Sequence, residues 1–166
     1  MEIILKNVKY AKFASDETAC FEATVYVNGV KMGEASNQGC GGETMIHPES
    51  LRKMLADYCQ TLPDVISGFL ANEDGTPFTF KPTPDYLIDQ AFSDQQAAAD
   101  LRKLLSKRVL IDRGDGIAQT KVLKADILAR LLSDEMIAQK MGTIKSKILN
   151  FMPFEDALRI FVERTA

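Results

Sequence analysis

Tryptophan is absent from the sequence, histidine occurs once, and cysteine occurs three times. The cysteines (Cys20, Cys40 and Cys59) are odd in number and lack the paired C-x-x-C spacing typical of zinc sites. With His47 they would supply four zinc ligands, but their spacing predicts neither a metal site nor a disulfide framework. We therefore expect three reduced thiols and no cofactor.

Long apolar runs are also missing. No run approaches the roughly 20 residues that a membrane-crossing helix needs. The first ten residues, MEIILKNVKY, contain Glu2 and no small-residue cleavage site, so they do not resemble a secretory signal. We expect a cytoplasmic protein that binds no membrane. Hydrophobic residues make up 46% of the 166 residues and charged residues 26%, a normal globular balance that argues against a disordered chain.

Charge is unevenly distributed along the chain. Residues 1–100 contain 7 Lys/Arg and 15 Asp/Glu, a net charge of −8. Residues 101–166 contain 13 Lys/Arg and 8 Asp/Glu, a net charge of +5, so the whole chain carries −3. Such a split is compatible with an acidic face for a basic partner, with a basic face for nucleic acid, with packing of the chain on itself or dimerisation, or with chance.

The first third of the chain predicts antiparallel strands. Ile3 to Ala14 alternates weakly, and residues 20–27 alternate strongly between apolar and polar side chains. Asn28-Gly29 predicts a type I′ turn into a return strand, Val30 to Ser36. Pro48 fits the first position of a helix whose apolar stripe would cover the sheet.

Helical patterns dominate the remainder. Helices are expected from Thr83-Pro84, from a capping-box pattern at Ser93, over Ala125–Leu132, and over Phe154–Glu163. A hairpin is expected around Asp112–Gly116, and proline-rich residues 63–83 suggest a connection with a short edge strand at Phe78–Phe80. The predicted fold is α+β: an N-terminal three-stranded antiparallel meander covered by a helix, then a mainly helical half with a small β-hairpin. The expected organisation is residues 1–62 as the meander unit, 63–83 as the connection and 84–166 as the helical unit, all within one compact domain.

The glycine cluster after the predicted sheet is the leading candidate for a contact site. It comprises Gly39, Cys40, Gly41, Gly42, Glu43 and Thr44, where the sheet is expected to hand over to the helix. Backbone N–H groups in such a loop, together with a helix N-terminus, can bind phosphate. The spacing matches no nucleotide-binding motif, no lysine follows within the loop, and Glu43 would repel an anion. A conformational role, a phosphate site and a loop that contacts a macromolecule all stay open.

Catalytic patterns are weak. A base at His47 would need an orienting carboxylate, and Glu43 and Glu49 are near it in sequence only. Cys40 and His47 could form a thiolate pair, but no third partner or oxyanion loop can be named. The sequence favours a protein that is not an enzyme.

Basic residues in the second half form the other candidate surface. Lys140, Lys145 and Lys147 lie near Ile144 and Ile148 and could contact phosphates of a nucleic acid. No nucleic-acid-binding motif accompanies them, so a solvated helix face is the competing interpretation.

Several segments at both ends of the chain are similar to one group of proteins. They are Asn7–Lys9 (NVK), Ser15–Thr18 (SDET), Phe21–Gly29 (FEATVYVNG), Ala35–Gly42 (ASNQGCGG) and Lys147–Leu158 (KILNFMPFEDAL). In these segments the chain resembles small uncharacterised proteins encoded by phages, prophages and plasmids. The resemblance implies a mobile genetic element in a bacterial cytoplasm, where small acidic proteins often bind host machinery.

Three functions follow as hypotheses. The first is a non-enzymatic binding or accessory protein of a mobile element, with a host protein or complex as its partner and inhibition of a restriction or CRISPR defence complex as one such role. The second is a nucleotide- or phosphate-binding protein that uses the Gly39–Thr44 loop. The third is a nucleic-acid-binding protein that uses the basic C-terminal half.

Overall fold

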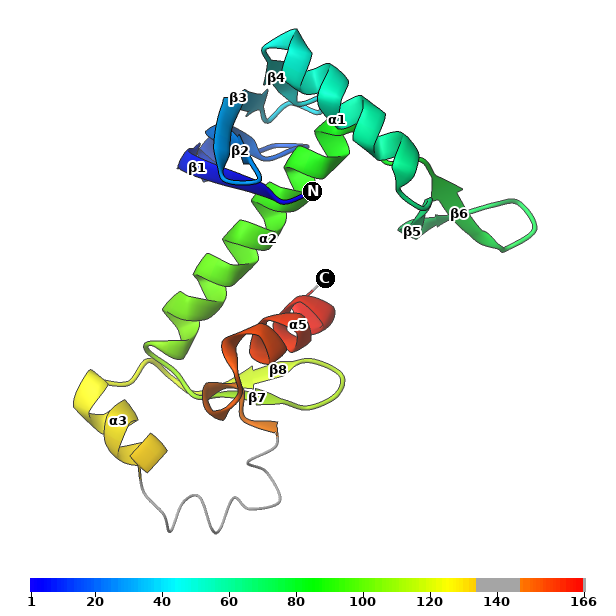
Figure 1. Ribbon diagram of the computed structural model, residues 1–166. Coiled ribbons are helices and arrows are strands. Elements are labelled where there is room, and N and C mark those ends of the chain that lie inside the picture. The colour runs from blue at the N-terminus through cyan, green and yellow to red at the C-terminus, as the bar shows by residue number, and fades with distance from the viewer. Residues whose placement is uncertain (134–146, 166) are drawn as a thin grey trace. The chain divides into compact units, whose positions relative to one another are not determined.

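Figure 1 shows the structure, a computed structural model that describes residues 1–133 and 147–165. The chain divides into two compact units, Met1–Ser93 and Asp94–Ala166. Helices and antiparallel strands occur in both, so the predicted α+β class is confirmed. The first unit contains β1 (Ile3–Tyr10), the 3-10 turn η1 (Lys12–Ala14), β2 (Cys20–Val27), β3 (Val30–Gln38), β4 (Met45–His47), α1 (Glu49–Thr61), β5 (Val65–Ala71), β6 (Pro77–Phe80) and the beginning of α2 (Pro84–Leu105).

The first unit is built on an antiparallel sheet with strand order β1-β2-β3-β4. Asn28 (φ 48°) and Gly29 (φ 82°) form the predicted tight turn between β2 and β3. The prediction of a three-stranded meander omitted one strand. Met45–His47 pairs with β3 and forms β4. In β4, Ile46 is buried between two exposed neighbours, and three residues give too little alternation for recognition from sequence.

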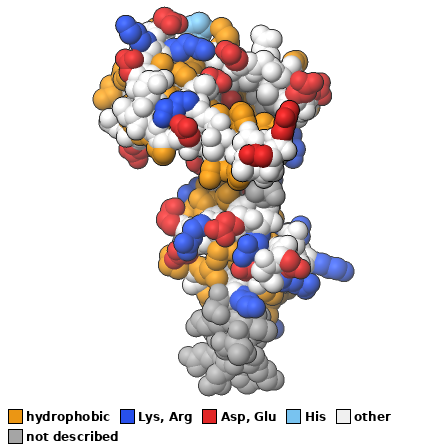
Figure 2. All heavy atoms as spheres, turned by 90° about the vertical axis from the view of Figure 1, so that its right-hand side faces the viewer, with side chains coloured by type: hydrophobic (Ala, Val, Ile, Leu, Met, Phe, Trp, Pro, Cys, Tyr) orange, Lys and Arg blue, Asp and Glu red, His pale blue; other side chains and the backbone are white. Residues whose placement is uncertain are grey.

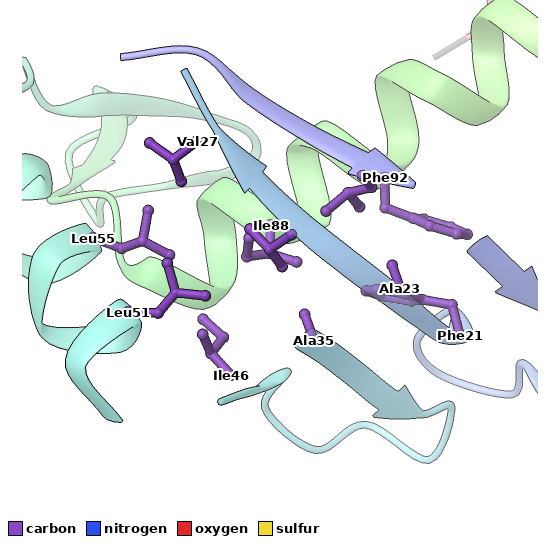
Figure 3. Close-up of a cluster of buried hydrophobic side chains, with 11 residues drawn as sticks. Phe21, Ala23, Val27, Ala35, Ile46, Leu51, Leu55, Ile88 and Phe92 are labelled. Carbon is purple, nitrogen blue, oxygen red and sulfur yellow. The ribbon is translucent and has the colours of Figure 1, made fainter. Parts of the chain in front are cut away.

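Helices α1 and α2 cover one face of this sheet. Figure 3 shows the cluster, in which side chains from β2, β3 and β4 gather with those of the two helices. The rings of Phe21 and Phe92 are stacked, with centroids 4.3 Å apart. Burial of each large apolar side chain contributes about 1.5–3 kcal/mol, so this cluster holds sheet and helices together. Its main members are Leu5, Phe21, Val25, Val27, Ile46, Leu51, Leu55, Ile88 and Phe92.

Two boundaries near the sheet differ from the prediction. The first strand ends at Tyr10 and not at Ala14, because the chain turns through η1 before β2. Helix α1 begins at Glu49, so Pro48 lies directly before the helix and not at its first position.

The proline-rich segment contains a hairpin. The strand expected at Phe78–Phe80 is present as part of β6, and its partner is β5, a strand that was not predicted from the sequence. Lys81 at the end of this hairpin forms a 3.2 Å ion pair with Asp64 at its beginning.

Helix α2 is continuous from Pro84 to Leu105, so the prediction of a new helix at Ser93 is wrong. The residues that follow Ser93 (DQQAAAD) include no glycine or proline and contain three alanines, the best helix former. A capping-box pattern starts a helix only where the preceding backbone is not already helical, and here it is.

The second unit confirms the predicted hairpin and helices. Strands β7 (Leu110–Asp112) and β8 (Ile117–Gln119) are antiparallel, and α3 (Ala125–Ser133) and α5 (Phe154–Thr165) lie where helices were expected. The 3-10 turn η3 (Leu149–Phe151) carries Asn150, whose side chain accepts from the Leu110 N–H (2.9 Å) and donates to the Arg108 carbonyl (2.9 Å). A third bond from Asn150 reaches the Leu105 carbonyl (3.3 Å), so one side chain ties the end of α2 to β7.

Of the helices in residues 1–133 and 147–165, none combines the length and apolar character required to cross a membrane. Figure 2 shows acidic and basic side chains interspersed with hydrophobic ones on the face that it draws.

Candidate functional site

The Gly39–Thr44 loop joins two strands of one sheet, because it lies between the end of β3 and the start of β4. The expected handover from sheet to helix is therefore wrong at this point: α1 begins only after β4. A helix N-terminus does not directly follow the glycines, so the loop lacks that element of the expected phosphate cradle.

The buried side chain of Asn37 organises the loop. Its amide oxygen accepts hydrogen bonds from the Thr18 hydroxyl (2.8 Å) and the Gly39 N–H (2.8 Å). Its amide nitrogen donates to the Gly42 carbonyl (3.0 Å) and the Thr44 hydroxyl (3.1 Å). Only 6% of Asn37 is exposed, and four bonds satisfy an amide side chain completely. Because buried polar groups are costly to leave unpaired, this network holds the loop in one conformation.

Gly39 brings a second loop against the first. Its carbonyl accepts the backbone N–H groups of Asp16 (3.0 Å), Glu17 (3.0 Å) and Thr18 (3.3 Å). Gly39 has φ +86°, and a Cβ at this position would overlap the Ala14 carbonyl oxygen. Glycine is therefore required for the close approach of the Ala11–Thr18 loop to the Gly39–Thr44 loop.

Thr44 connects the loop to α2. It is fully buried, and its hydroxyl donates to a carboxylate oxygen of Asp89 at 2.5 Å. Burial raises the pKa of Asp89; the Thr44 hydrogen bond opposes this rise, and the negative charge of Asp85 adds to it. A chain of hydrogen bonds thus runs from the loop backbone through Asn37 and Thr44 to the helix.

The two joined loops present a mixed aromatic and acidic surface, which we call the two-loop surface. Phe13, on η1, is 96% exposed. A depression of about 410 Å³ beside the glycines is lined by residues that include Cys40, Gly42 and Glu43. The two-loop surface comprises the exposed residues Lys12, Phe13, Asp16, Glu17, Cys40, Gly41, Gly42 and Glu43.

The loop offers few free hydrogen-bond donors and no positive charge for binding an anion. The N–H of Gly39 already donates to Asn37, and the N–H of Gly41 donates to the Thr18 hydroxyl at 3.3 Å. A Cβ at Gly41 would meet the Glu17 carboxylate, so a negative charge lies directly beside the loop. Glu43 adds a second carboxylate, which forms an exposed 3.3 Å ion pair with Arg52. The occupied hydrogen-bond donors and the nearby carboxylates both count against a phosphate site in this loop.

The predicted basic surface is described in part. Lys147 is exposed two residues before η3, whereas Lys140 and Lys145 lie outside the described residues. The pKa of the nearby Asp112 is lowered chiefly by the Gly114 N–H and further by Arg164 and Lys147. Arg164 also forms a 3.2 Å ion pair with Asp112. Lys147 therefore lies near a carboxylate whose charge is already partly balanced by Arg164.

The cysteines and the histidine occupy separate environments. Cys59 is buried in α1, Cys20 is partly buried in β2, and Cys40 is exposed in the loop; all three are free thiols. His47 lies on β4, where its register partner is Glu34 on β3. Within the described part of the chain, no three His, Cys, Asp or Glu side chains are grouped so that they could hold a metal ion.

Four residues that shape this site were not singled out from the sequence. Asn37, Thr18 and Asp89 are far apart in the chain, and Phe13 was assigned to a strand. For Thr18 no local signal exists, because its role depends on a contact with Asn37, 19 positions away. For Asn37 a local sign was available, because an asparagine two residues before a glycine can accept the N–H of that glycine in an Asx turn. The Ser-Asp-Glu-Thr turn directly after Phe13 was the available sign that the strand ends earlier.

No protein-family model, no curated protein and no solved structure matches the chain.

Proposed function

We propose that the chain is a non-enzymatic binding protein that contacts a partner protein through the two-loop surface. The observation that carries this proposal is Phe13, a large aromatic side chain that is 96% exposed on a framework held by buried hydrogen bonds. Rigid aromatic side chains are enriched among the residues that dominate protein–protein affinity. Burial of such a side chain by a partner would contribute about 1.5–3 kcal/mol.

The negative charge of the two-loop surface indicates what kind of partner surface would fit it. Asp16, Glu17 and Glu43 surround the glycines, and residues 1–93 contain 7 Lys/Arg against 13 Asp/Glu, a net charge of −6. An acidic rim around an aromatic anchor selects a partner whose own surface is basic around an apolar pocket.

The sequence resemblance supports a narrower form of the proposal. Proteins of phages, prophages and plasmids act inside a host, so the partner would be a host protein or complex. Restriction and CRISPR complexes bind nucleic acid through basic surfaces, and an acidic protein could occupy such a surface.

Affinity purification from a bacterial host tests the proposal. Wild type, Phe13→Ala and the control Val30→Ala would be used as parallel baits. Val30 is 60% exposed at the opposite end of the same strands, so the control removes a comparable apolar group outside the two-loop surface. We expect a partner that is recovered with wild type and Val30→Ala and is lost with Phe13→Ala.

The purified pair then gives dissociation constants. Loss of about 1.4 kcal/mol or more, which is a tenfold change, is expected for Phe13→Ala. Equal recovery and equal affinity for all three baits would contradict the proposal.

The phosphate hypothesis is tested separately by thermal shift with nucleotides and inorganic phosphate. A ligand at 100 times its dissociation constant stabilises by about 2.7 kcal/mol, which shifts the melting temperature by several degrees. We expect no shift. A shift that Gly41→Val abolishes would instead support the loop as an anion site.

A further inference from the structure

The second unit contains a groove with an apolar floor. It has a volume of about 380 Å³, and Leu104, Val122 and Phe161 line it. Val122 is 61% exposed, although it lies between segments whose backbone hydrogen bonds hold it in place. The Leu123 N–H donates to the Lys107 carbonyl (2.9 Å), and the Thr120 N–H donates to the Val109 carbonyl (3.1 Å). The floor is therefore built from fixed backbone.

Basic side chains form the rim of this groove. Lys103, in the last turn of α2, and Lys107, two residues beyond the end of that helix, are both exposed, and Arg108 follows them. The Arg108 guanidinium is held by a 3.1 Å hydrogen bond to the Thr120 carbonyl, so its position is set by the protein. Asp100 is the one acid among the lining residues.

Two further lysines flank Val122 in the sequence. Lys121 and Lys124 are both exposed, and the hydrogen bond from Leu123 to Lys107 brings their segment to the rim. Among the residues that the structure describes, none forms an ion pair with Lys103, Lys107, Lys121 or Lys124. Residues 94–166 contain 13 Lys/Arg and 10 Asp/Glu, a net charge of +3, and at the groove itself Lys103, Lys107 and Arg108 outnumber the one acid, Asp100.

A polynucleotide fits this groove poorly. Proteins that bind single strands stack bases on exposed aromatic faces along a continuous basic track. The aromatic side chain here, Phe161, is only 9% exposed, and Asp100 interrupts the basic rim. An aliphatic floor inside a cationic rim suits an apolar side chain that is flanked by carboxylates.

We propose that this groove binds an acidic peptide segment of a partner protein, with an apolar side chain seated on Leu104, Val122 and Phe161 and its carboxylates paired with Lys103, Lys107 and Arg108. This surface is independent of the two-loop surface. It uses the opposite charge, and all its residues belong to the second unit.

Fluorescence anisotropy with the full-length protein tests the proposal. The probe is a fluorescein-labelled peptide with Phe-Leu at its centre and Asp and Glu elsewhere. Comparison probes are the same peptide with Ala-Ala at the centre, its Lys/Arg counterpart, and a labelled oligothymidylate. Variants are K103E/K107E, Val122→Asn, and the control Lys53→Glu on the exposed face of α1.

The acidic Phe-Leu probe is expected to bind most tightly. Its affinity should fall at least about tenfold with K103E/K107E and severalfold with Val122→Asn, and it should be unchanged with Lys53→Glu. It should also weaken as salt rises from about 0.1 M to about 1 M, where the Debye length shrinks from about 10 Å to about 3 Å. All substituted positions are exposed, and circular dichroism will show that the variants fold.

Three results would overturn the proposal. The first is unchanged binding with K103E/K107E. The second is equal binding of the Ala-Ala probe, which would show that the apolar floor is not used. The third is tighter binding of oligothymidylate than of any peptide, which would make the groove a polynucleotide site.

Discussion

Asn37 in the first unit and Asn150 in the second each join segments that are distant in sequence, and each supports one of the two proposed surfaces. Asn37 forms four hydrogen bonds, two of them with side-chain hydroxyls, and it holds two loops together. Asn150, on η3, forms three, all with backbone groups, and one of them is the Leu105 carbonyl at the end of the long helix α2. A surface made of loops needs a side-chain network for its shape, whereas a helix supplies most of its own hydrogen bonds.

Substitution of Asn37 should have the largest effect. Asn37→Ala leaves four groups without this partner: the Thr18 and Thr44 hydroxyls, the Gly39 N–H and the Gly42 carbonyl. Each buried group that stays unpaired costs about 1–3 kcal/mol of stability. We expect amides of β3 and β4 to open with a free energy that is about 3 kcal/mol lower, as measured by hydrogen exchange.

Asn150→Ala gives the matched comparison. We expect a smaller loss, about 1–2 kcal/mol, confined to amides of β7 and the end of α2. If Asn150→Ala proved the more damaging of the two, the contrast between a loop surface and a helix surface would be wrong.

Gly39→Ala should have the next largest effect. The left-handed conformation costs an alanine roughly 1–2 kcal/mol, and the added Cβ must also move away from the Ala14 carbonyl oxygen. We expect a loss of about 2 kcal/mol or more in the free energy of unfolding in urea.

Gly42→Ala is the control, because no atom lies within 4 Å of a Cβ at Gly42. We expect little change, or a gain of about 0.4–1 kcal/mol from the stiffer unfolded chain. Equal losses for Gly39→Ala and Gly42→Ala would argue against close docking of the two loops.

Asp89→Asn should change the pH dependence of stability. The pKa of Asp89 is raised in the folded state, so the wild type loses stability as pH increases from the unfolded carboxyl pKa of about 3.9 up to the raised folded value. The variant lacks this loss, so its free energy of unfolding should rise relative to that of wild type as pH increases across this range. Above the folded pKa, the difference in the free energy of unfolding should stay constant. Urea unfolding at a series of pH values measures the difference.

Asp89→Ala separates charge from hydrogen bonding. It removes the acceptor of the Thr44 hydroxyl as well as the charge, so it should be less stable than Asp89→Asn at every pH. A difference between wild type and Asp89→Asn that shrinks with rising pH would contradict the assigned cause of the shift.

Phe13→Ala should have the smallest effect on stability. A side chain that is 96% exposed contributes little to folding, and we expect a change within about 0.5 kcal/mol in the free energy of unfolding. A loss above 1 kcal/mol would mean that Phe13 packs against the protein and is not available as an anchor.

Much of the fold follows from local patterns in the sequence. The Asn28-Gly29 turn, the alternation of β2 and the apolar stripe of α5 each arise from residues close together in the chain. Strand β4 is too short to show such a pattern, and β5 was obscured by the prolines around it.

The candidate site could be predicted only in outline. The glycines at 39 and 41 mark a loop with unusual backbone conformation, and both do have positive φ. The network of Thr18, Asn37, Thr44 and Asp89 depends on tertiary contacts between residues up to 45 positions apart, as between Thr44 and Asp89. The spacing of these residues along the chain does not predict such contacts.

Hydrogen exchange of the protein with and without its partner tests the central claim most directly. If the two-loop surface is the contact, amides of Ala11–Thr18 and Gly39–Thr44 will become protected in the complex, and those at the Val27–Val30 turn will not. Protection at that turn, with none in the two loops, would contradict the proposed function.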